Sequence, residues 1–268
     1  MKKRIIALTL FSCMLALTLF GCGSNKASST SANNTPAKKS TLVVGLDDQF
    51  PPMGFRDAQG NITGFDIDLA TEAAKRLGMQ IKFQPIDWKV KEQELNSGNI
   101  DCIWNGMTIT PEIKDAMTVS QPYMKNEQII VVKKDSPIAS QADLAGKKLG
   151  LQAGSSANNA LDANTSFKST LGKVLPYDDN SKALMDLDAG GIDAVLMDSV
   201  VALYYVQKDG KYKVLSGSLA DEEYGVGFRK ADTELCSKVE GALKQMATDG
   251  KMAEISNKWF GKDVTIIK

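Results

Sequence analysis

Two short phrases of the sequence each end an apolar run on a polar side chain. In SGNIDCIWNGM the run closes on Asn105, and in GGIDAVLMDSV it closes on Asp198. Either both residues are ordinary strand ends, with Asp198 serving as the N-cap of the helix that follows, or two matching strands direct polar groups to one shared place. In the second case the carboxylate of Asp198 can form charge-assisted hydrogen bonds with a cationic ligand group.

A third phrase, LQAGSSA, carries groups suited to an anion. Gln152 stands at the end of a predicted strand, and Gly154, Ser155 and Ser156 open the helix that follows. The first backbone N–H groups of a helix have no partner within it, so they form a ready anion site. Helix capping by Ser155 is the simpler interpretation, and both roles can hold together.

Other kinds of chemistry are excluded by composition. The 268 residues include no histidine, which rules out Ser-His-Asp catalysis, histidine proton shuttles and histidine metal sites. The 32 basic and 32 acidic residues balance, whereas nucleic-acid-binding proteins carry concentrated basic surfaces. No phosphate-binding G-x-x-x-x-G-K-[ST] loop occurs. We therefore expect no cofactor, no metal and no nucleic-acid partner.

Strand and helix patterns alternate from residue 41 onward. Apolar, β-branched runs predict strands at 41–46, 79–86, 100–105, 127–134, 147–152, 173–177, 192–197 and 224–230. Helical periodicity and capping residues predict helices at 65–78, 89–98, 110–117, 155–163, 180–190, 199–208, 231–250 and 251–261.

This alternation indicates an α/β fold with largely parallel sheets. Two rounds of it, each with a G-x-I-D strand, favour two similar lobes over one large sheet. In open α/β sheets, ligands bind outside the carboxyl ends of the strands, and the crevice between lobes is a natural ligand site. Asn105 and Asp198 are then expected to face the same crevice, one from each lobe.

The N-terminus has the pattern of an export signal. Three basic residues precede a largely apolar stretch of 16 residues, shorter than the roughly 20 that a membrane span needs. The stretch ends in LFGC, which resembles the bacterial lipobox and implies cleavage after residues 1–21, acylation of the Cys22 sulfur with a fatty acid such as palmitate, and anchoring outside the cell membrane. The alternative is an ordinary cleaved signal in which Cys22 is incidental. Residues 22–40 are rich in Ser, Asn, Ala and Lys, which predicts a flexible tether.

Two further cysteines, Cys102 and Cys236, belong to the predicted folded part. In an exported protein they can form a disulfide, but the sequence alone does not bring them within bonding distance. Two unpaired buried thiols are the equally open alternative.

Six phrases taken in order resemble the extracellular amino-acid-binding proteins of ABC importers, which have the type II periplasmic-binding-protein fold. They are FPPMGFRDAQGNITGFDIDLA, DCIWNGMTIT followed by SQPYM, AGSSA, IDAVLMD, YGVGFRK and KWFG. The resemblance implies two mostly parallel sheets flanked by helices, with the chain crossing between lobes near 131–134 and 224–228. Lobe 1 is then 41–131 plus 226–268, and the inserted lobe 2 is 132–225.

The resemblance also implies a set of ligand-binding residues. In the first lobe they are Asp47 and Phe50 after the first strand, Trp88, and a polar rim of Asn105, Gly106 and Thr108. Phe50 and Trp88 offer flat apolar walls to a side chain. A core position is the alternative for Trp88, although its polar neighbours favour the cleft.

The second lobe is expected to bind the charged groups of an amino acid. Gln152, Ser155 and Ser156 would hold its α-carboxylate and Asp198 its α-ammonium. A helix-capping turn is the alternative for the rim around Thr108, and capping is the expected role of Thr110.

One position departs from the resemblance. The family usually has arginine three residues after the position of Thr110, where its guanidinium clamps the α-carboxylate, but this chain has Ile113 there and Lys114 next. A hydrogen bond to a charged group contributes about 1.5–3 kcal/mol, so its loss lowers affinity roughly ten- to a hundredfold. Three explanations stay open: Lys114 reaches round, the amides at Ser156 and Thr108 suffice, or the ligand is not an α-amino acid.

The expected function is that of a monomeric, lipid-anchored receptor on the outer face of the cell membrane or facing the periplasm. It would capture a polar amino acid between its lobes and deliver it to an ABC permease driven by an ATPase. Two alternatives are an enzyme on the same scaffold, such as a dehydratase, and a ligand-sensing surface lipoprotein. Against the enzyme, no pair of acidic residues stands out in the sequence as placed for acid–base chemistry.

Overall fold

The structure is a computed structural model that describes residues 40–267, within one compact unit, Lys39–Lys268. The predicted signal peptide at 1–21, the predicted lipidation site Cys22 and all but the last residue of the predicted tether at 22–40 lie outside the described residues. None of the helices described is both long and apolar enough to cross a membrane.

Ten strands form the main sheet, and three short strands form a second one. The main sheet contains β1 (Thr41–Leu46), β5 (Gln80–Pro85), β6 (Cys102–Thr108), β7 (Thr118–Val119), β8 (Met124–Lys133), β9 (Lys148–Gln152), β10 (Lys173–Tyr177), β11 (Ala194–Asp198), β12 (Tyr212–Val214) and β13 (Ala220–Phe228). The small sheet contains β2 (Gln49–Phe50), β3 (Gly54–Arg56) and β4 (Ile62–Thr63).

Helices follow most of these strands, as the predicted alternation requires. They are α1 (Phe65–Arg76), α2 (Lys91–Asn96), α3 (Pro111–Ala116), α4 (Ser156–Ala163), α5 (Thr165–Thr170), α6 (Asn180–Ala189), α7 (Ser199–Asp209), α8 (Thr233–Thr248) and α9 (Lys251–Phe260), with 3-10 turns at Trp88–Val90 and Gln141–Leu144. The small sheet, α5 and β12 were not predicted, because segments of two to six residues carry too little periodicity to stand out.

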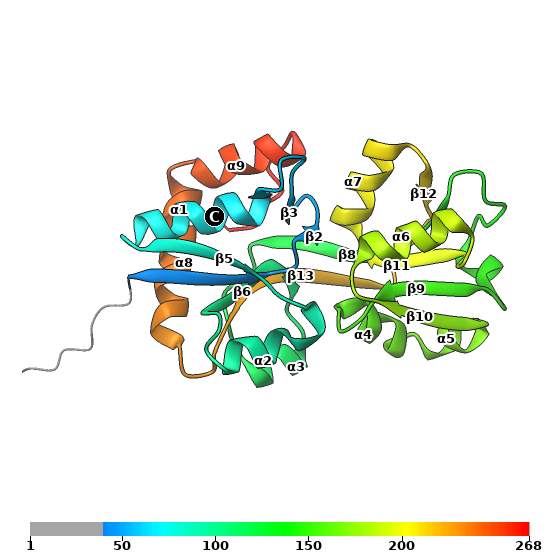
Figure 1. The fold of residues 1–268 in the computed structure, drawn as a ribbon, viewed down its shortest axis with the longest axis horizontal. Coiled ribbons are helices and arrows are strands. Elements are labelled where there is room, and N and C mark those ends of the chain that lie inside the picture. The colour runs from blue at the N-terminus through cyan, green and yellow to red at the C-terminus, as the bar shows by residue number, and fades with distance from the viewer. Residues whose placement is uncertain (1–39, 268) are drawn as a thin grey trace, which may run out of the picture. The chain divides into compact units, whose positions relative to one another are not determined.

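The strand order β10-β9-β11-β8-β13-β6-β1-β5 joins two groups of parallel strands through an antiparallel pair. We call the group β5-β1-β6 with its helices the first lobe and the group β10-β9-β11 with its helices the second lobe. Figure 1 shows the first lobe, with α1, α8 and α9, beside the second lobe, with α4 to α7. The predicted α/β fold with largely parallel strands is confirmed.

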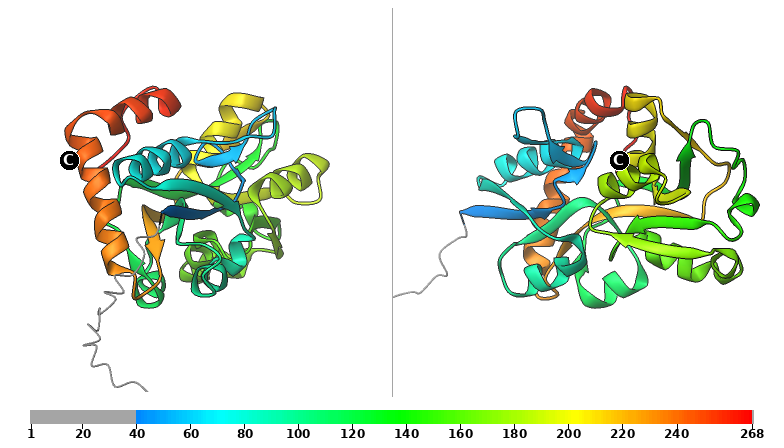
Figure 2. Two further views of the ribbon diagram at one scale, coloured as in Figure 1. Left: turned by 60° about the vertical axis from the view of Figure 1, so that its left-hand side comes forward. Right: turned by 45° about the vertical axis from the view of Figure 1, so that its right-hand side comes forward.

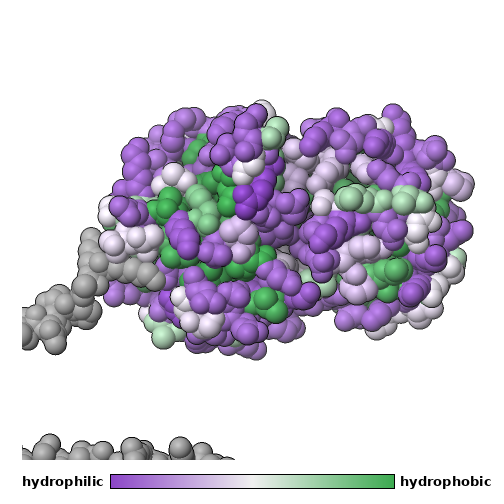
Figure 3. Space-filling view, viewed as in Figure 1, coloured by the Kyte–Doolittle hydropathy of each residue, from purple (hydrophilic) through white to green (hydrophobic). Residues whose placement is uncertain are grey.

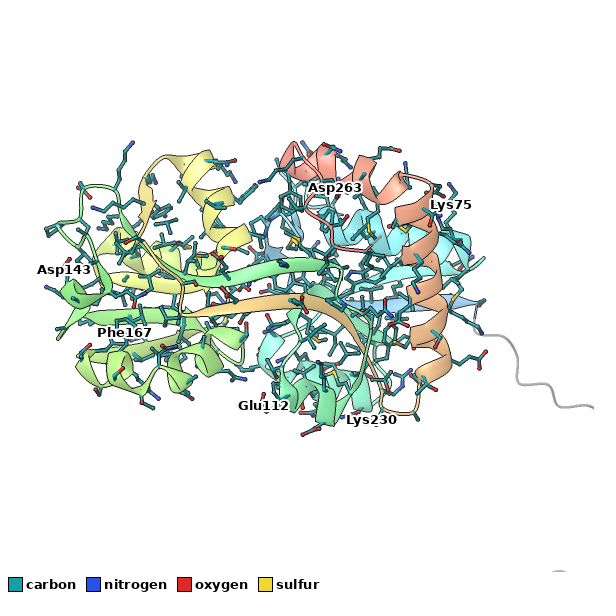
Figure 4. The ribbon with its side chains drawn as sticks, turned by 180° about the vertical axis from the view of Figure 1, so that it is seen from behind. Lys75, Glu112, Asp143, Phe167, Lys230 and Asp263 are labelled. Carbon is teal, nitrogen blue, oxygen red and sulfur yellow. The ribbon has the colours of Figure 1, made fainter. Side chains whose placement is uncertain are left out.

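The long strands β8 and β13 connect the lobes, and Figure 4 shows them lying side by side across both. Their pairing runs from Met124 opposite Tyr224 to Gln128 opposite Ala220. Beyond this stretch β13 continues along β6 and β8 continues along β11. The paired stretch of β8 and β13 begins at residues 124 and 220, before the crossovers predicted near 131–134 and 224–228. Both strands start earlier in the chain than their apolar residues indicate. The lobe limits at 131/132 and 225/226 stay a prediction.

Apolar side chains bury both faces of the main sheet. In β1, Leu42 and Val44 join a large core that runs along one face of both lobes, whereas Val43 packs on the opposite face of the first lobe. The opposite face of the second lobe has its own core around Leu149 and Leu196. Both α8 and α9 pack against α1 over the large core (Figure 2).

The two cysteines of the folded part lie within the large core. Cys102 opens β6 and Cys236 lies in α8, and both side chains are buried. No disulfide joins them.

Candidate ligand-binding site

A cavity of about 410 Å³ lies between the lobes and is lined by residues from both. On the face shown in Figure 3, mostly hydrophilic residues cover the region where the two lobes meet. Eight of the ten predicted ligand-binding residues line the cavity: Phe50, Trp88, Gly106, Thr108, Gln152, Ser155, Ser156 and Asp198.

The other two predicted residues, Asp47 and Asn105, lie behind the wall of the cavity. The backbone N–H of Asp47 donates to Oδ1 of Asn105 at 3.1 Å, and the carboxylate of Asp47 accepts from Nε2 of Gln152 at 2.7 Å. Burial raises the pKa of Asp47 to about 6. Asp47 therefore connects the first lobe to the second through Gln152, and Asn105 braces that contact.

The prediction that Asn105 ends its strand is wrong. β6 continues through Thr108, because Met107 and Thr108 pair with Gly225 and Tyr224 of β13. The side chain of Asn105 is only 1% exposed. The cavity instead receives Gly106 and Thr108, the last part of the strand.

Asp198 ends β11 as predicted and occupies the N-cap position of α7, but its side chain makes no capping hydrogen bond. Its Oδ1 atom accepts from Nδ2 of Asn126 at 2.7 Å, from Nε2 of Gln128 at 3.0 Å and from the hydroxyl of Tyr224 at 2.7 Å. The residue is 3% exposed, and burial together with the charge of Glu222 raises its pKa to about 7. The carboxylate is thus fixed by neutral donors at the edge of the cavity.

Glu222 forms a pair with Asp198, which the sequence did not indicate. Its Oε2 atom accepts from the same two amides, Nδ2 of Asn126 at 2.8 Å and Nε2 of Gln128 at 3.0 Å, and from Oγ1 of Thr108 at 2.9 Å. Glu222 lines a second, wider cavity of about 1410 Å³ rather than the smaller one. Only the connecting strands β8 and β13 bring the two acidic residues together, so no local pattern in the sequence marks the pair.

Aromatic rings form the apolar wall of the cavity. Trp88 is 8% exposed and packs in the core with Ile113, so the core and cleft interpretations of this residue both hold. Gly106 has φ +58°, and a Cβ atom there would lie 2.8 Å from the ring of Phe50. Only glycine therefore allows the strand to approach this ring.

The first-lobe rim is held from behind by Asp66 of α1. Its Oδ2 atom accepts from the Gly106 N–H at 2.7 Å and from the Tyr123 hydroxyl at 2.9 Å. Complete burial raises the pKa of Asp66 to about 7. Asp66 thus fixes the backbone of the rim, although it does not line the cavity.

The predicted anion-binding segment borders the cavity on the second-lobe side. Ser155 is the N-cap residue of α4, but its hydroxyl donates back to the Gln152 carbonyl at 2.8 Å and does not cap the helix. The capping interpretation of Ser155 is therefore wrong. The hydroxyl of Ser156 lies 3.1 Å from that of Thr108 in the other lobe.

The structure excludes one of the three explanations for how the site recognises a ligand with Ile113 at the arginine position. This side chain lines the cavity beside Trp88, and Thr110 caps α3 by accepting from the Ile113 N–H at 3.2 Å, which confirms the predicted cap. Lys114 lines the wider cavity and not the smaller one. It therefore does not reach round into the position of the missing guanidinium.

A different lysine, Lys91, lines the smaller cavity and was not predicted. It is 9% exposed, and burial lowers its pKa. Its Nζ atom donates to the Gly154 carbonyl of the second lobe at 2.9 Å and lies 5.3 Å from the centre of the Trp88 ring. The available signal was its position three residues after Trp88, which places both side chains on one face of a helical turn.

Asn126 and Gln128 were also missed. They alternate with exposed residues at the start of β8, where the period of two places them on one buried face. The strand was predicted at 127–134, which left Asn126 outside it, and Gln128 was not singled out within it.

The sequence of this chain is similar to those of known solute-binding proteins. The family model for bacterial extracellular solute-binding proteins, family 3, matches residues 42–262. The L-cystine-binding protein TcyJ of Escherichia coli (strain K12) is 34% identical over 235 residues, which cover 87% of each chain. The arginine-binding extracellular protein ArtP of Bacillus subtilis (strain 168) is 32% identical, covering 97% of this chain and 98% of the relative.

Solved structures give the same result for the fold. The crystal structure of an ABC uptake transporter substrate-binding protein from Streptococcus pneumoniae with bound histidine is 43% identical and superposes with a TM-score of 0.82. It covers 84% of this chain and 94% of that chain. The two-lobed type II periplasmic-binding-protein fold is thereby confirmed, and the chain belongs to family 3 of the bacterial extracellular solute-binding proteins.

Proposed function

We propose that this protein captures an amino acid by closing its two lobes over the cavity. The observation that carries the proposal is the carboxylate of Asp198, which is buried at the cavity and held by neutral partners. None of the ion pairs within residues 40–267 includes Asp198. A buried carboxylate without a cation is costly, and an α-ammonium group would supply the missing charge.

Three features support an amino acid as the ligand class. The start of α4 offers backbone N–H groups to a carboxylate, and the rings of Phe50 and Trp88 offer apolar walls to a side chain. Direct contacts already join the lobes around the cavity, from Asp47 to Gln152 and from Thr108 to Ser156. The relatives named above bind cystine, arginine or histidine, which favours a polar amino acid here.

The captured amino acid would then be delivered to a membrane permease driven by an ATPase, as befits a relative of an ABC uptake transporter protein. Cys22 would carry the lipid that keeps the receptor, a monomer, outside the cell membrane. In this proposal the protein performs no reaction on its ligand. Asp198 is buried and Glu222 is half-buried beside it, but they open onto different cavities and so do not flank one bound molecule.

Binding and catalysis can be separated in one experiment. The full chain, purified in mild detergent, is screened by thermal shift against the twenty proteinogenic L-amino acids and L-cystine, and hits are measured by calorimetry. We expect a dissociation constant in the micromolar range or below for at least one polar amino acid, recovered unchanged by mass spectrometry. Consumption of the amino acid would support an enzyme, and failure to bind any member would contradict the proposal.

The proposed roles in transport and in membrane anchoring are tested in the cells that produce the protein. Deleting the gene should abolish uptake of the radiolabelled amino acid found in the screen, whereas a purely sensory protein would leave uptake intact. The Cys22→Ser variant should lose labelling by a fatty-acid probe and leave the membrane fraction. Retention of the label would exclude Cys22 as the lipid site.

A further inference from the structure

The charges around the ligand cavity are unequal. Among the residues that line it, Glu92, Glu112 and Asp198 are acidic, and Lys91 is the one basic residue. Lys91 is the first residue of α2 in the first lobe, and its ammonium group contacts the second lobe at Gly154. The single positive charge of the cavity wall therefore lies where the two lobes meet.

The hydrogen-bond partners of the Lys91 ammonium group are neutral, although the charge of Glu92 acts on it and opposes the lowering of its pKa by burial. It donates to the Gly154 carbonyl at 2.9 Å and, over a longer distance of 3.4 Å, to the Trp88 carbonyl, and it lies over the Trp88 ring. None of the ion pairs within residues 40–267 includes Lys91. Burial of an ammonium group without a counter-ion is unfavourable, and it becomes favourable when an anion binds beside it.

Lys91 also has bonding capacity left for a ligand. An ammonium group carries three N–H donors, and the two carbonyls occupy at most two of them. A ligand carboxylate can therefore bind Lys91 without breaking the contact with Gly154.

The surroundings of Lys91 are suited to a carboxylate. Gly154, its partner, directly precedes Ser155 and Ser156, whose segment presents the N-terminal amides of α4. Gly154 has φ +70°, and a Cβ atom there would lie 2.8 Å from the Cα atom of Lys89, so glycine lets this segment approach the first lobe closely. The amides and the ammonium group thus gather at one part of the cavity.

We propose that Lys91 binds the carboxylate of the ligand in place of the arginine that Ile113 replaces, and that it makes the cavity select amino acids over the corresponding amines. The inference rests on the proposed function, since it concerns the same cavity. It explains how the site recognises an anionic group although Ile113 is apolar and Lys114 lies at the other cavity.

The test compares ligands that differ by the carboxylate alone. The full chain is titrated calorimetrically at pH 8 with the twenty L-amino acids, L-cystine and the amines formed by their decarboxylation. For the amino acid that binds most tightly, we expect the unchanged protein to prefer it over its amine by about tenfold or more. The Lys91→Met variant should lose this preference, with a ratio near one, because its amine affinity changes little while its amino-acid affinity falls.

Three further variants keep the test decisive. Lys91→Gln preserves a donor for the Gly154 carbonyl without the charge and should also lose the preference, whereas Lys91→Arg should retain most of it. Lys114→Met, which removes a lysine from the wider cavity, should leave the ratio unchanged. Circular dichroism melting identifies any variant that does not fold, and Lys91→Gln or Lys91→Arg then gives the answer.

The outcomes separate this inference from the function on which it rests. If the unchanged protein binds amino acids and the Lys91 variants keep the same preference, Lys91 does not contact the carboxylate, and the inference fails alone. A role of Lys91 limited to holding the lobes together would lower both affinities equally and leave the ratio intact, which also overturns it. If the unchanged protein binds none of the probes, both proposals fail.

Discussion

Strands β6 and β11 carry nearly the same phrase, glycine followed by Ile-Asp and an apolar run, yet they contribute to the site in different ways. β11 ends on Asp198, whose carboxylate lines the cavity. β6 passes Asn105 and continues for three more residues, so its contribution is Gly106 and Thr108. Asn105 itself turns away from the cavity to hold the backbone of Asp47.

The difference comes from the neighbouring strands. The antiparallel partner β13 pairs with β6 as far as Thr108, and this pairing extends the strand. β11 pairs with β8 through Asp198, and the helix α7 begins at the next residue. The same local phrase therefore yields a bracing residue in one lobe and a ligand-facing acid in the other. Five predictions test that contrast.

The largest effect is expected from Asp198→Asn. The substitution keeps the shape of the side chain but removes its charge, so affinity for the amino acid should fall about a hundredfold, which corresponds to one strong charge-assisted hydrogen bond. The measurement is isothermal titration calorimetry at pH 8.

The matched control is Asp193→Asn. Asp193 belongs to the same phrase and accepts from the Lys148 N–H at 2.8 Å, outside the residues that line the cavity. Its substitution should change affinity less than twofold. Equal losses for the two variants would remove Asp198 from the site.

Asn105→Ala should affect stability instead of binding. The buried N–H of Asp47 loses its acceptor, which costs about 1–3 kcal/mol and, for a folded part of this size, lowers Tm by roughly 2–12 °C. Affinity for the amino acid should stay within about threefold, since Asn105 does not line the cavity. Asn99→Ala, on the exposed side of the same phrase, is the control and should leave Tm nearly unchanged. A hundredfold loss of affinity in Asn105→Ala would show that Asn105 contributes to binding as Asp198 does, which contradicts the proposed difference between β6 and β11.

Acidification should weaken binding. The pKa of Asp198 is raised to about 7 by burial and by Glu222, so the ionised form that attracts an ammonium group predominates at pH 8 and becomes scarce at pH 6. Affinity should fall roughly tenfold over this interval, and the Asp198→Asn variant should show no such dependence. If the affinity of the unchanged protein is the same at pH 6 and pH 8, the carboxylate of Asp198 does not change its charge in this range, and the prediction fails.

The stability of the ligand-free protein should change in the opposite direction. Burial raises the pKa values of Asp66 and Asp198 to about 7, above the ordinary value of 3.8, so the folded protein retains protons that the unfolded chain releases. Their contribution to stability is therefore present below pH 4 and is lost as the pH rises through 7. Melting at pH 5.5 and pH 8 should show a higher Tm at pH 5.5 without ligand.

The smallest effect is expected from Thr108→Val. Valine keeps the volume but removes the hydroxyl that donates to Glu222 and contacts Ser156 of the second lobe. Loss of the neutral hydrogen bond between the Thr108 and Ser156 hydroxyls, which joins the lobes, costs about 0.5–1.5 kcal/mol, so affinity should fall two- to tenfold. Thr118→Val, at the surface of the first lobe, serves as the control. An unchanged affinity would limit the contribution of β6 to the backbone of Gly106.

Much of the fold followed from local signals in the sequence. Thr110 and Pro111 predicted the start of α3, and β10 was predicted with its observed limits. Helix capping and strand propensity depend on residues only a few positions apart, so the sequence reports them directly. The cavity residues were placed by the resemblance of whole phrases, and eight of the ten meet at one cavity.

The missed residues share a physical reason. Gln128 and Glu222 belong to strands about ninety residues apart. The amide of Gln128 donates to both Glu222 and Asp198 only because β8 pairs with β13 and with β11. Lys91 resembled a solvated helix residue, and its burial arises from the Gly154 segment of the other lobe. Propensity and periodicity act over one turn or one strand, so they do not report contacts of this kind.

The sequence by itself determined the α/β alternation, the pair of G-x-I-D strands and the acid at residue 198, because each depends on neighbours along the chain. Only the tertiary structure decided that Asn105 holds the backbone of Asp47 while Asp198 faces the cavity, and that Glu222 shares the amides of Asp198. It also decided that a buried lysine, Lys91, lines the same cavity as Ile113. These outcomes depend on which strands pair and where the lobes meet, and the free energies of burial and pairing are set by groups far away in sequence.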